Sequence, residues 1–245
     1  MKPLALLFLP LAALAGMPVP IELHLMSQCP DATVCLRDLI TPALPGLADI
    51  STVRLTFIGN ATSGGGVSCP HGPSECLGDM LHLCGVALST PPSPPPAAAY
   101  WDFTMCLFSD YSRVCEKEFV QHCAAKAKAG WGFDELNRCA SDLGPRGGAQ
   151  LLRESVERTK ETGVRASCTV RVAGSTVCVR DGGQWKQCER GSRPEDLVRL
   201  VRELYEAETG GLLKQEREVA DGERRSLKEY VEQEGLPKVD RWMEL

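Results

Sequence analysis

The stretch VPIELHLMSQCPDATVCLRDLI, Val19–Ile40, decides the fold. Its first eight residues alternate apolar and polar side chains, which predicts a half-buried β-strand. Cys29-Pro30-Asp31 follows, and proline with an acidic residue behind it suits the first turn of a helix. Apolar residues between Leu36 and Ile40 predict the buried face of that helix. The sequence therefore places Cys29 at a junction between a strand and a helix.

Outward from this stretch, the chain alternates strands and helices. Val53–Gly59 (VRLTFIG) is rich in β-branched and aromatic residues and predicts a second strand, parallel to the first. After an interruption, Ala149–Gly163 predicts a helix, and Cys168–Val172 with Thr176–Arg180 predict a β-hairpin around Ala173-Gly174-Ser175. A capping box at Ser192 starts another helix, expected to run to the glycine pair at 210–211. The order β-α-β, insertion, α-β-β-α predicts an α/β protein with a thioredoxin-like fold.

The interruption defines the expected domain organisation. Residues 64–145 contain several helical patterns and many cysteines, so we expect a disulfide-rich, mainly helical insertion after the second strand. Within it, Ser89–Ala97 (STPPSPPPA) predicts a polyproline-like linker. The whole domain is expected to span residues 19–210. Residues 211–245 are strongly charged and predict a helical, solvated tail.

The compartment is indicated by the N-terminus and the cysteines. Residues 1–15 have one lysine, a short apolar run and an Ala-x-Ala ending, which is typical of a cleaved signal peptide. Twelve cysteines behind such a segment predict disulfides in an oxidising compartment. Asn60-Ala61-Thr62 is a glycosylation sequon, usable on the same route. We expect a secreted protein, or one sent to the lysosome or vacuole.

Several classes of partner are not expected. A net charge of −5 with both signs interspersed gives no reason to expect nucleic acid. No apolar run long enough to span a bilayer follows the N-terminus, so stable membrane insertion after signal cleavage is not expected. The spacing of Cys69, Cys76 and Cys84 with His71 and His82 fits no common zinc arrangement. Neither a metal nor a cofactor is expected.

Cys29 is the candidate nucleophile. The N-terminus of a helix stabilises a thiolate, and the thiolate attacks disulfides through a mixed-disulfide intermediate. A second thiol normally follows at the fourth position, where this chain has Ala32. Cys35 is about 600° and ~9 Å further along a helix, so it cannot pair with Cys29 inside a regular helix. Cys168, which opens the third strand, could pair with Cys29; Cys35 or Cys168 is therefore the candidate resolving thiol.

The other cysteines are best explained as structural. His71 could assist thiol chemistry as a proton carrier, or His71-Gly72 could simply shape a loop. Cys178 and Cys188 could tie the hairpin to the turn that follows it. The candidates for structural disulfides are Cys69, Cys76, Cys84, Cys106, Cys115, Cys123, Cys139, Cys178 and Cys188.

Cys69–Cys84, CPHGPSECLGDMLHLC, resembles the signature of the gamma-interferon-inducible lysosomal thiol reductase (GILT) family, C-Q-H-G-x-x-E-C-x-x-N-x-x-x-x-C. The matching residues are Cys69, His71, Gly72, Glu75, Cys76 and Cys84. Pro70 stands in place of the motif's glutamine, and Asp79 in place of its asparagine. The resemblance covers roughly residues 20–188, and the CPDA form at Cys29 resembles a divergent, fungal-type branch.

The resemblance implies a thioredoxin-like fold with a helical insertion and reduction of protein disulfides in acidic compartments. The first cysteine of the family's catalytic pair corresponds to Cys29 and the second to Ala32. The expected activity is a thiol oxidoreductase acting on disulfide-containing proteins, with Cys29 as attacking thiol and a small thiol as reductant. The alternative is a catalytically inactive, secreted binding or scaffold protein of the same fold, which permanent pairing of all twelve cysteines would favour.

Overall fold

The computed structural model describes residues 17–89 and 99–233. The expected signal peptide and most of the expected proline-rich linker lie outside these residues. The chain divides into two compact units, and Pro18–Glu203 forms the larger one. Within the described residues, no helix combines the length and the apolar character that crossing a membrane requires.

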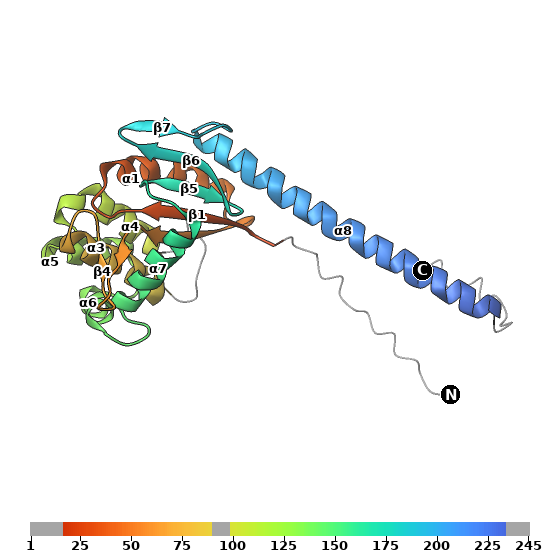
Figure 1. Cartoon of the computed structure of the whole chain (residues 1–245), viewed down its shortest axis with the longest axis horizontal. Helices are drawn as coiled ribbons and strands as arrows, with labels where there is room; N and C mark the ends of the chain where they lie inside the picture. The colour runs from red at the N-terminus through yellow and green to blue at the C-terminus, as the bar shows by residue number, and fades with distance from the viewer. Residues whose placement is uncertain (1–16, 90–98, 234–245) are drawn as a thin grey trace. The chain divides into compact units, whose positions relative to one another are not determined.

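A five-stranded mixed sheet is the centre of the larger unit (Figure 1). Strand β1 (Val19–Leu25) pairs in parallel with β2 (Ser51–Phe57) along its whole length. On its other side β1 pairs antiparallel with β5 (Thr169–Val172), which continues through a hairpin into β6 (Ser175–Asp181) and then β7 (Gln184–Lys186). The strand order is β2-β1-β5-β6-β7.

Strand β1 is buried on both of its faces, so the expected half-buried strand was wrong. Its polar residues Glu22 and His24 are 8% and 0% exposed. Helix α7 (Gly148–Thr162) covers that face, because Arg158 bonds to Glu22 and Thr159 bonds to His24. Polar residues in a strand predict a solvent-facing side only when no other element supplies matching polar groups.

A continuous helical segment follows β1 and packs on the opposite face. It begins with α1 (Pro30–Cys35) and continues as η1 (Leu36–Ile40), which has the wider π-helical turn, then α2 (Thr41–Ala43) and η2 (Leu44–Gly46). Proline at the first position of α1 needs no hydrogen-bonded N–H there. Cys29 precedes it in an extended conformation, with φ −97° and ψ 124°.

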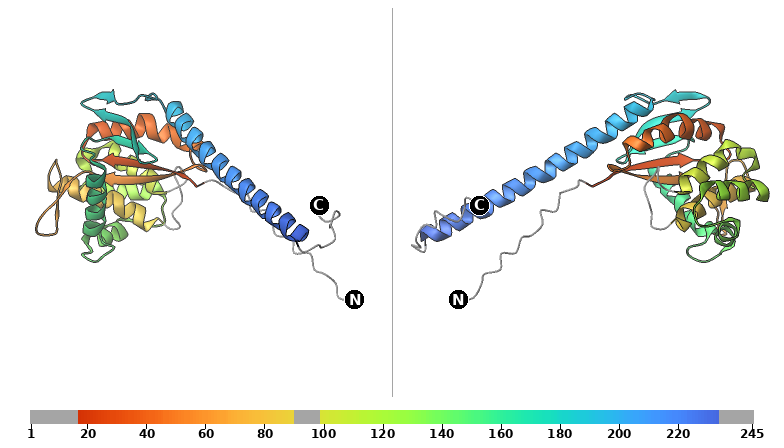
Figure 2. Two further views of the ribbon diagram at one scale, coloured as in Figure 1. Left: turned by 45° about the vertical axis from the view of Figure 1, so that its right-hand side comes forward. Right: turned by 180° about the vertical axis from the view of Figure 1, so that it is seen from behind.

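Between β2 and α7 lies a second, mainly helical region (Figure 2). After the short strands β3 (Asn60–Ala61) and β4 (Val67–Ser68), it consists of α3 (Pro73–Leu88), α4 (Ala99–Ser109), η3 (Tyr111–Arg113), α5 (Lys117–Ala127) and α6 (Phe133–Ser141). These helices share their own apolar core, with Phe103, Leu107 and Leu136 fully buried.

Five disulfides cross-link the larger unit. Two of them, Cys84–Cys139 and Cys106–Cys123, join helices of the helical region. Cys69–Cys76 closes the start of α3, and Cys178–Cys188 ties β6 to the turn after β7. Cys35–Cys168 joins the end of α1 to the residue before β5.

Helix α8 (Pro194–Gln233) runs past the glycine pair at 210–211, where the sequence predicted a break. Its beginning belongs to the larger unit, in which Leu197 and Val201 are buried. From Leu204 onward the residues form the second unit. A glycine inside a helix costs about 1 kcal/mol relative to alanine, which weakens a long helix without ending it. Residues 234–245 of the expected tail lie outside the described part.

Candidate active site around Cys29

Cys29 keeps a free thiol and is half-buried at the start of α1. Its Sγ donates a hydrogen bond to the backbone oxygen of Ser167, at 3.6 Å. Its backbone N–H bonds to the oxygen of Met26, which closes a tight turn between β1 and α1. Ser167 also holds this turn from its side chain, because its Oγ accepts the N–H of Met26 at 2.9 Å. The thiol therefore lies where the ends of β1, α1 and β5 meet.

A buried disulfide includes Cys168, the residue that follows Ser167. Cys35 and Cys168 are both 0% exposed, and their Cα atoms are 6.2 Å apart. Cys168 follows Ser167, through a peptide bond that is cis, and exchanges two backbone hydrogen bonds with Arg180. Cys168 is therefore one residue away from the group that contacts Cys29, but its sulfur is bonded to Cys35.

A charged pair fixes the first turn of α1 to the hairpin. Arg180 on β6 bonds to Asp31 at 3.2 Å, and its guanidinium stacks over the ring of Trp185 at 5.3 Å. The backbone N–H of Gly183 also donates to the Asp31 carboxylate. Gly183 has φ +73°, a backbone conformation that glycine adopts without strain. These contacts set the position of the residues directly after Cys29.

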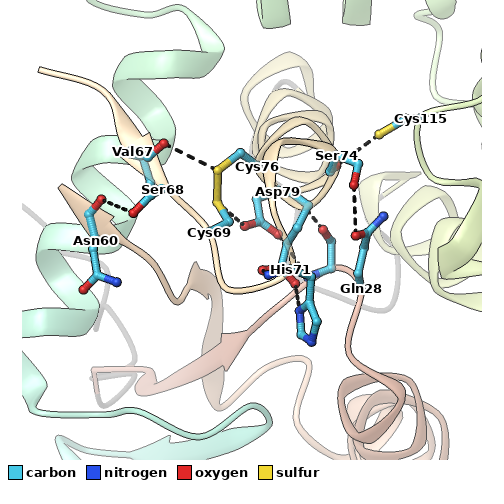
Figure 3. Close-up of a disulfide and its surroundings, with 12 residues drawn as sticks. Gln28, Asn60, Val67, Ser68, Cys69, His71, Ser74, Cys76, Asp79 and Cys115 are labelled. Carbon is cyan, nitrogen blue, oxygen red and sulfur yellow. Dashed lines mark hydrogen bonds and ion pairs between the residues drawn. A yellow bond between two sulfur atoms is a disulfide. The ribbon is translucent and has the colours of Figure 1, made fainter. Parts of the chain in front are cut away.

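The first two turns of α3 face the residues directly before Cys29 (Figure 3). Ser27 donates its N–H to Asp79 at 3.0 Å and its hydroxyl to the backbone oxygen of Glu75 at 3.0 Å. Burial raises the pKa of Asp79 well above its ordinary value of 3.8; the Ser27 hydrogen bonds act against this shift, and the Glu75 charge adds to it.

Glu75 in turn holds His71, whose ring nitrogen and backbone N–H both bond to that carboxylate. The Cys69–Cys76 disulfide closes the loop that carries His71.

Cys115 is the second free thiol, and it is exposed. Its Sγ donates to the backbone oxygen of Ser74 at 3.0 Å, and the Ser74 hydroxyl bonds to Gln28 (Figure 3). Partial burial raises the pKa of Cys115; a backbone hydrogen bond from Gly78 opposes the shift, and the Asp79 charge adds to it. Cys115 was expected to form a disulfide, and the structure differs from that expectation.

The structure brings some of the candidate residues together and separates others. Cys29 contacts Ser167, the residue before Cys168, but the disulfide joins Cys168 to Cys35 and not to Cys29. His71 is engaged by Glu75. Eight of the nine cysteines expected to be structural lie in the other four disulfides. Asn60 is exposed on β3.

The sequence analysis missed the residues that hold the thiol in place, namely Ser27, Ser167 and Arg180. All three act through partners between 48 and 149 positions away in the chain. A serine or an arginine in a strand or loop gives no local signal of such contacts. The one usable signal was Asp79, which departs from the motif at a residue that proves to be buried.

Comparison with known proteins agrees with this geometry. Residues 20–127 match the family model described as gamma interferon inducible lysosomal thiol reductase (GILT). GILT-like protein 1 of Drosophila melanogaster is 30% identical over 154 residues, which cover 58% of this chain and 59% of that protein. The chain is therefore similar to the GILT family over these residues. The GILT motif supplies the Cys69–Cys76 disulfide, Glu75 and His71, all of which lie on the α3 side of Cys29.

A solved structure shows the fold of this chain. MdbA of Actinomyces oris, a thiol-disulfide oxidoreductase, aligns with a TM-score of 0.53 and 13% identity over 79% of this chain and 83% of its own. Oxidised Mtb DsbA aligns with a TM-score of 0.48 and 18% identity, over 76% and 83% of the two chains. The predicted thioredoxin-like fold is confirmed. This chain spans only 59% of the length of the Drosophila relative.

Proposed function

We propose that this protein is a thiol–disulfide oxidoreductase of the secretory pathway that reduces disulfides in other proteins with Cys29 as its attacking thiol. One observation carries the proposal. Ten of the twelve cysteines are paired, and Cys29 remains a thiol at the junction of β1 and α1. The five disulfides support an oxidising compartment, and the partial exposure of Cys29 supports its access to a substrate.

The reaction proceeds in three thiol–disulfide exchanges. The Cys29 thiolate attacks one sulfur of a substrate disulfide, forms a mixed disulfide, and releases the other substrate sulfur as a thiolate that takes up a proton. A small thiol then attacks the Cys29 sulfur and frees the reduced substrate. A second small thiol releases the first, so that two small thiols become one small disulfide and Cys29 is a thiol again.

The resolving step depends on the state of Cys35–Cys168. While that disulfide is closed, neither of its sulfurs can act as a thiol, so the small thiol is needed. After its reduction, Cys168 is the better placed of the two, because it follows the Ser167 carbonyl that Cys29 contacts. Ala32, in the usual position of the resolving cysteine, is fully buried in α1. We assign His71 to the support of α3 through Glu75 rather than to proton transfer.

The test compares the two free thiols. Insulin disulfide reduction by a small thiol is measured between pH 4.5 and 7.5 for the full chain, Cys29→Ser and the matched control Cys115→Ser. We expect Cys29→Ser to fall to the rate without protein, with an unchanged melting temperature, and Cys115→Ser to stay active. A wild-type protein no faster than Cys29→Ser across this range would exclude the reductase and favour the scaffold alternative.

A further inference from the structure

Asp79 is a buried carboxyl group without a charged partner of opposite sign. It is 0% exposed, and within residues 17–89 and 99–233 no ion pair joins it to a lysine, arginine or histidine. The groups that face it are Glu75 on its own helix, Ser27 after β1, Cys69 after β4, and Cys115 between η3 and α5. His71 is bonded to Glu75.

The contacts of its two oxygens indicate which form the carboxyl takes. Oδ1 accepts the backbone N–H of Ser27 at 3.0 Å. Oδ2 lies 3.7 Å from the Sγ of Cys69, a disulfide sulfur that carries no hydrogen. A hydrogen bond across that contact therefore needs its proton on Asp79. An ionised carboxylate would instead be a second negative charge buried beside Glu75, which is strongly unfavourable.

We propose that Asp79 is a positioning residue for Cys29: as a neutral carboxylic acid it ties the turn between β1 and α1 to helix α3, and loss of its proton loosens that tie. Ser27 lies two residues before Cys29, inside the turn that Met26 closes with the Cys29 N–H. The proposal rests on Cys29 being the reactive thiol, as argued above. It adds that the geometry of the thiol depends on pH through a residue that does not touch it.

The sign of the effect follows from the burial of Asp79. Burial raises the pKa of Asp79 in the folded protein above its ordinary value of 3.8, so the folded state holds this proton more tightly than the unfolded chain. The folded state is then stabilised fully below the ordinary value. That contribution is lost as pH rises through the pKa of the folded protein. The turn at Cys29 is therefore best fixed in acid.

The decisive variant is Asp79→Asn. Asparagine keeps an oxygen that can accept the Ser27 N–H, and its N–H can donate toward Cys69, so it imitates the protonated acid at every pH. Asp79→Ala removes both contacts at every pH. Asp102→Asn, at an exposed position on α4, is the matched control for loss of an aspartate. All variants are made in the full chain with its disulfides intact.

Two readouts follow the tie itself. Hydrogen exchange measures protection of the peptide that contains Ser27, from pH 4.5 to 8 and corrected for the intrinsic rate. Protection should fall with rising pH in wild type and in Asp102→Asn, stay high in Asp79→Asn, and be low throughout in Asp79→Ala. The melting temperature of wild type should fall by roughly 3 to 6 °C relative to Asp79→Asn over the same range.

A third readout links the tie to the thiol. Alkylation of Cys29, resolved from Cys115 by mass spectrometry, should proceed at the same rate in wild type and Asp79→Asn at pH 4.5. The two rates should diverge several-fold toward pH 8, with the midpoint found for Ser27 protection. Equal Ser27 protection and equal Cys29 rates in the two proteins across the range would overturn the proposal. Because neither measurement needs turnover, this outcome is separate from failure of the reductase activity.

Discussion

Glu22 in β1 and Asp79 in α3, which faces the turn after β1, are both buried acidic side chains, and they differ in their partners. Glu22 lies inside the strand, 8% exposed, and receives Arg158 at 2.7 Å and Arg171 at 2.9 Å. Asp79 is 0% exposed, faces the turn, and accepts the backbone N–H of Ser27. Burial acts to raise the pKa of Glu22, but Arg158, His24 and Arg171 together outweigh it and the pKa is lowered, whereas the pKa of Asp79 is raised by burial.

This difference in charge matching distinguishes the sheet from the region around Cys29. In the middle of the sheet, a buried charge is matched by arginines from α7 and β5, so the scaffold is charged and internally neutralised. Beside Cys29, a buried carboxyl has no such match, so that region responds to protons. Because arginines match its charge, Glu22 stabilises the folded state more as pH rises. Asp79 has no such match, so it stabilises the folded state more as pH falls. The predictions below alter one side of this comparison at a time.

The largest expected effect comes from removing both arginines. Arg158→Ala with Arg171→Ala leaves Glu22 buried without a cation, because His24, at 4.0 Å, is neutral at pH 7. We expect the free energy of unfolding to fall by about 3 kcal/mol at pH 7, measured by denaturant titration. Arg153→Ala, which breaks an exposed pair with Glu157 on the same helix, should change it by less than about 1 kcal/mol. Equal losses of unfolding free energy in the double variant and in Arg153→Ala would show that Arg158 and Arg171 are not needed to stabilise buried Glu22.

The next effect concerns His24, a buried base in the matched region. Burial lowers the pKa of His24 from 6.5 to about 4, while the Glu22 charge opposes the shift. The unfolded chain then binds more protons between these values, so stability falls as pH falls through this window. The unfolding free energy of wild type should fall between pH 7 and pH 4.5, and in His24→Gln this fall should be smaller by about 2 kcal/mol. Parallel pH profiles for wild type and His24→Gln would contradict the assignment.

The fold could be predicted from sequence because its signals are local. Apolar alternation in Val19–Leu25, the proline after Cys29 and the turn at Ala173-Gly174 each indicate their element within a few residues. The helical patterns within residues 64–145 likewise predicted the helical region. The burial of β1 on both faces could not be predicted, because the partners of Glu22 and His24 lie more than 130 positions away.

The site could be predicted only in its outline. The position of Cys29 follows from the strand-to-helix junction, but twelve cysteines have no local code for their pairing. Cys35–Cys168 spans 133 positions, and the free thiol of Cys115 follows only once the other pairs are known. The proton-responsive character of Asp79 depends on which groups surround it in three dimensions, above all on the missing cation.

A smaller effect tests whether Glu75 contributes to the unmatched region. The Glu75 charge raises the pKa of Asp79, after burial. Glu75→Gln keeps the oxygen that accepts the His71 N–H and removes the charge. We expect the pH midpoint of Ser27 exchange protection to move to lower pH by up to about one unit. His122→Gln, at an exposed position on α5, serves as control and should leave the midpoint in place. A midpoint that stays in place or moves upward in Glu75→Gln would show that the Glu75 charge does not raise the pKa of Asp79.

The smallest effect lies at Arg180, where the site has its own matched pair. Arg180 and Asp31 are 18% and 15% exposed, and Arg180 also stacks on Trp185. Lysine keeps the charge but loses the planar group that stacks and bonds at once, so Arg180→Lys should lower the unfolding free energy by about 1 kcal/mol. Arg190→Lys, in an exposed pair with Glu203, should have no measurable effect. Because lysine replaces arginine without a change of charge, the Arg180→Lys loss should be constant from pH 5 to 8, unlike the loss tied to Asp79. A loss that changes with pH would show that the matched and unmatched charges beside Cys29 act as one network.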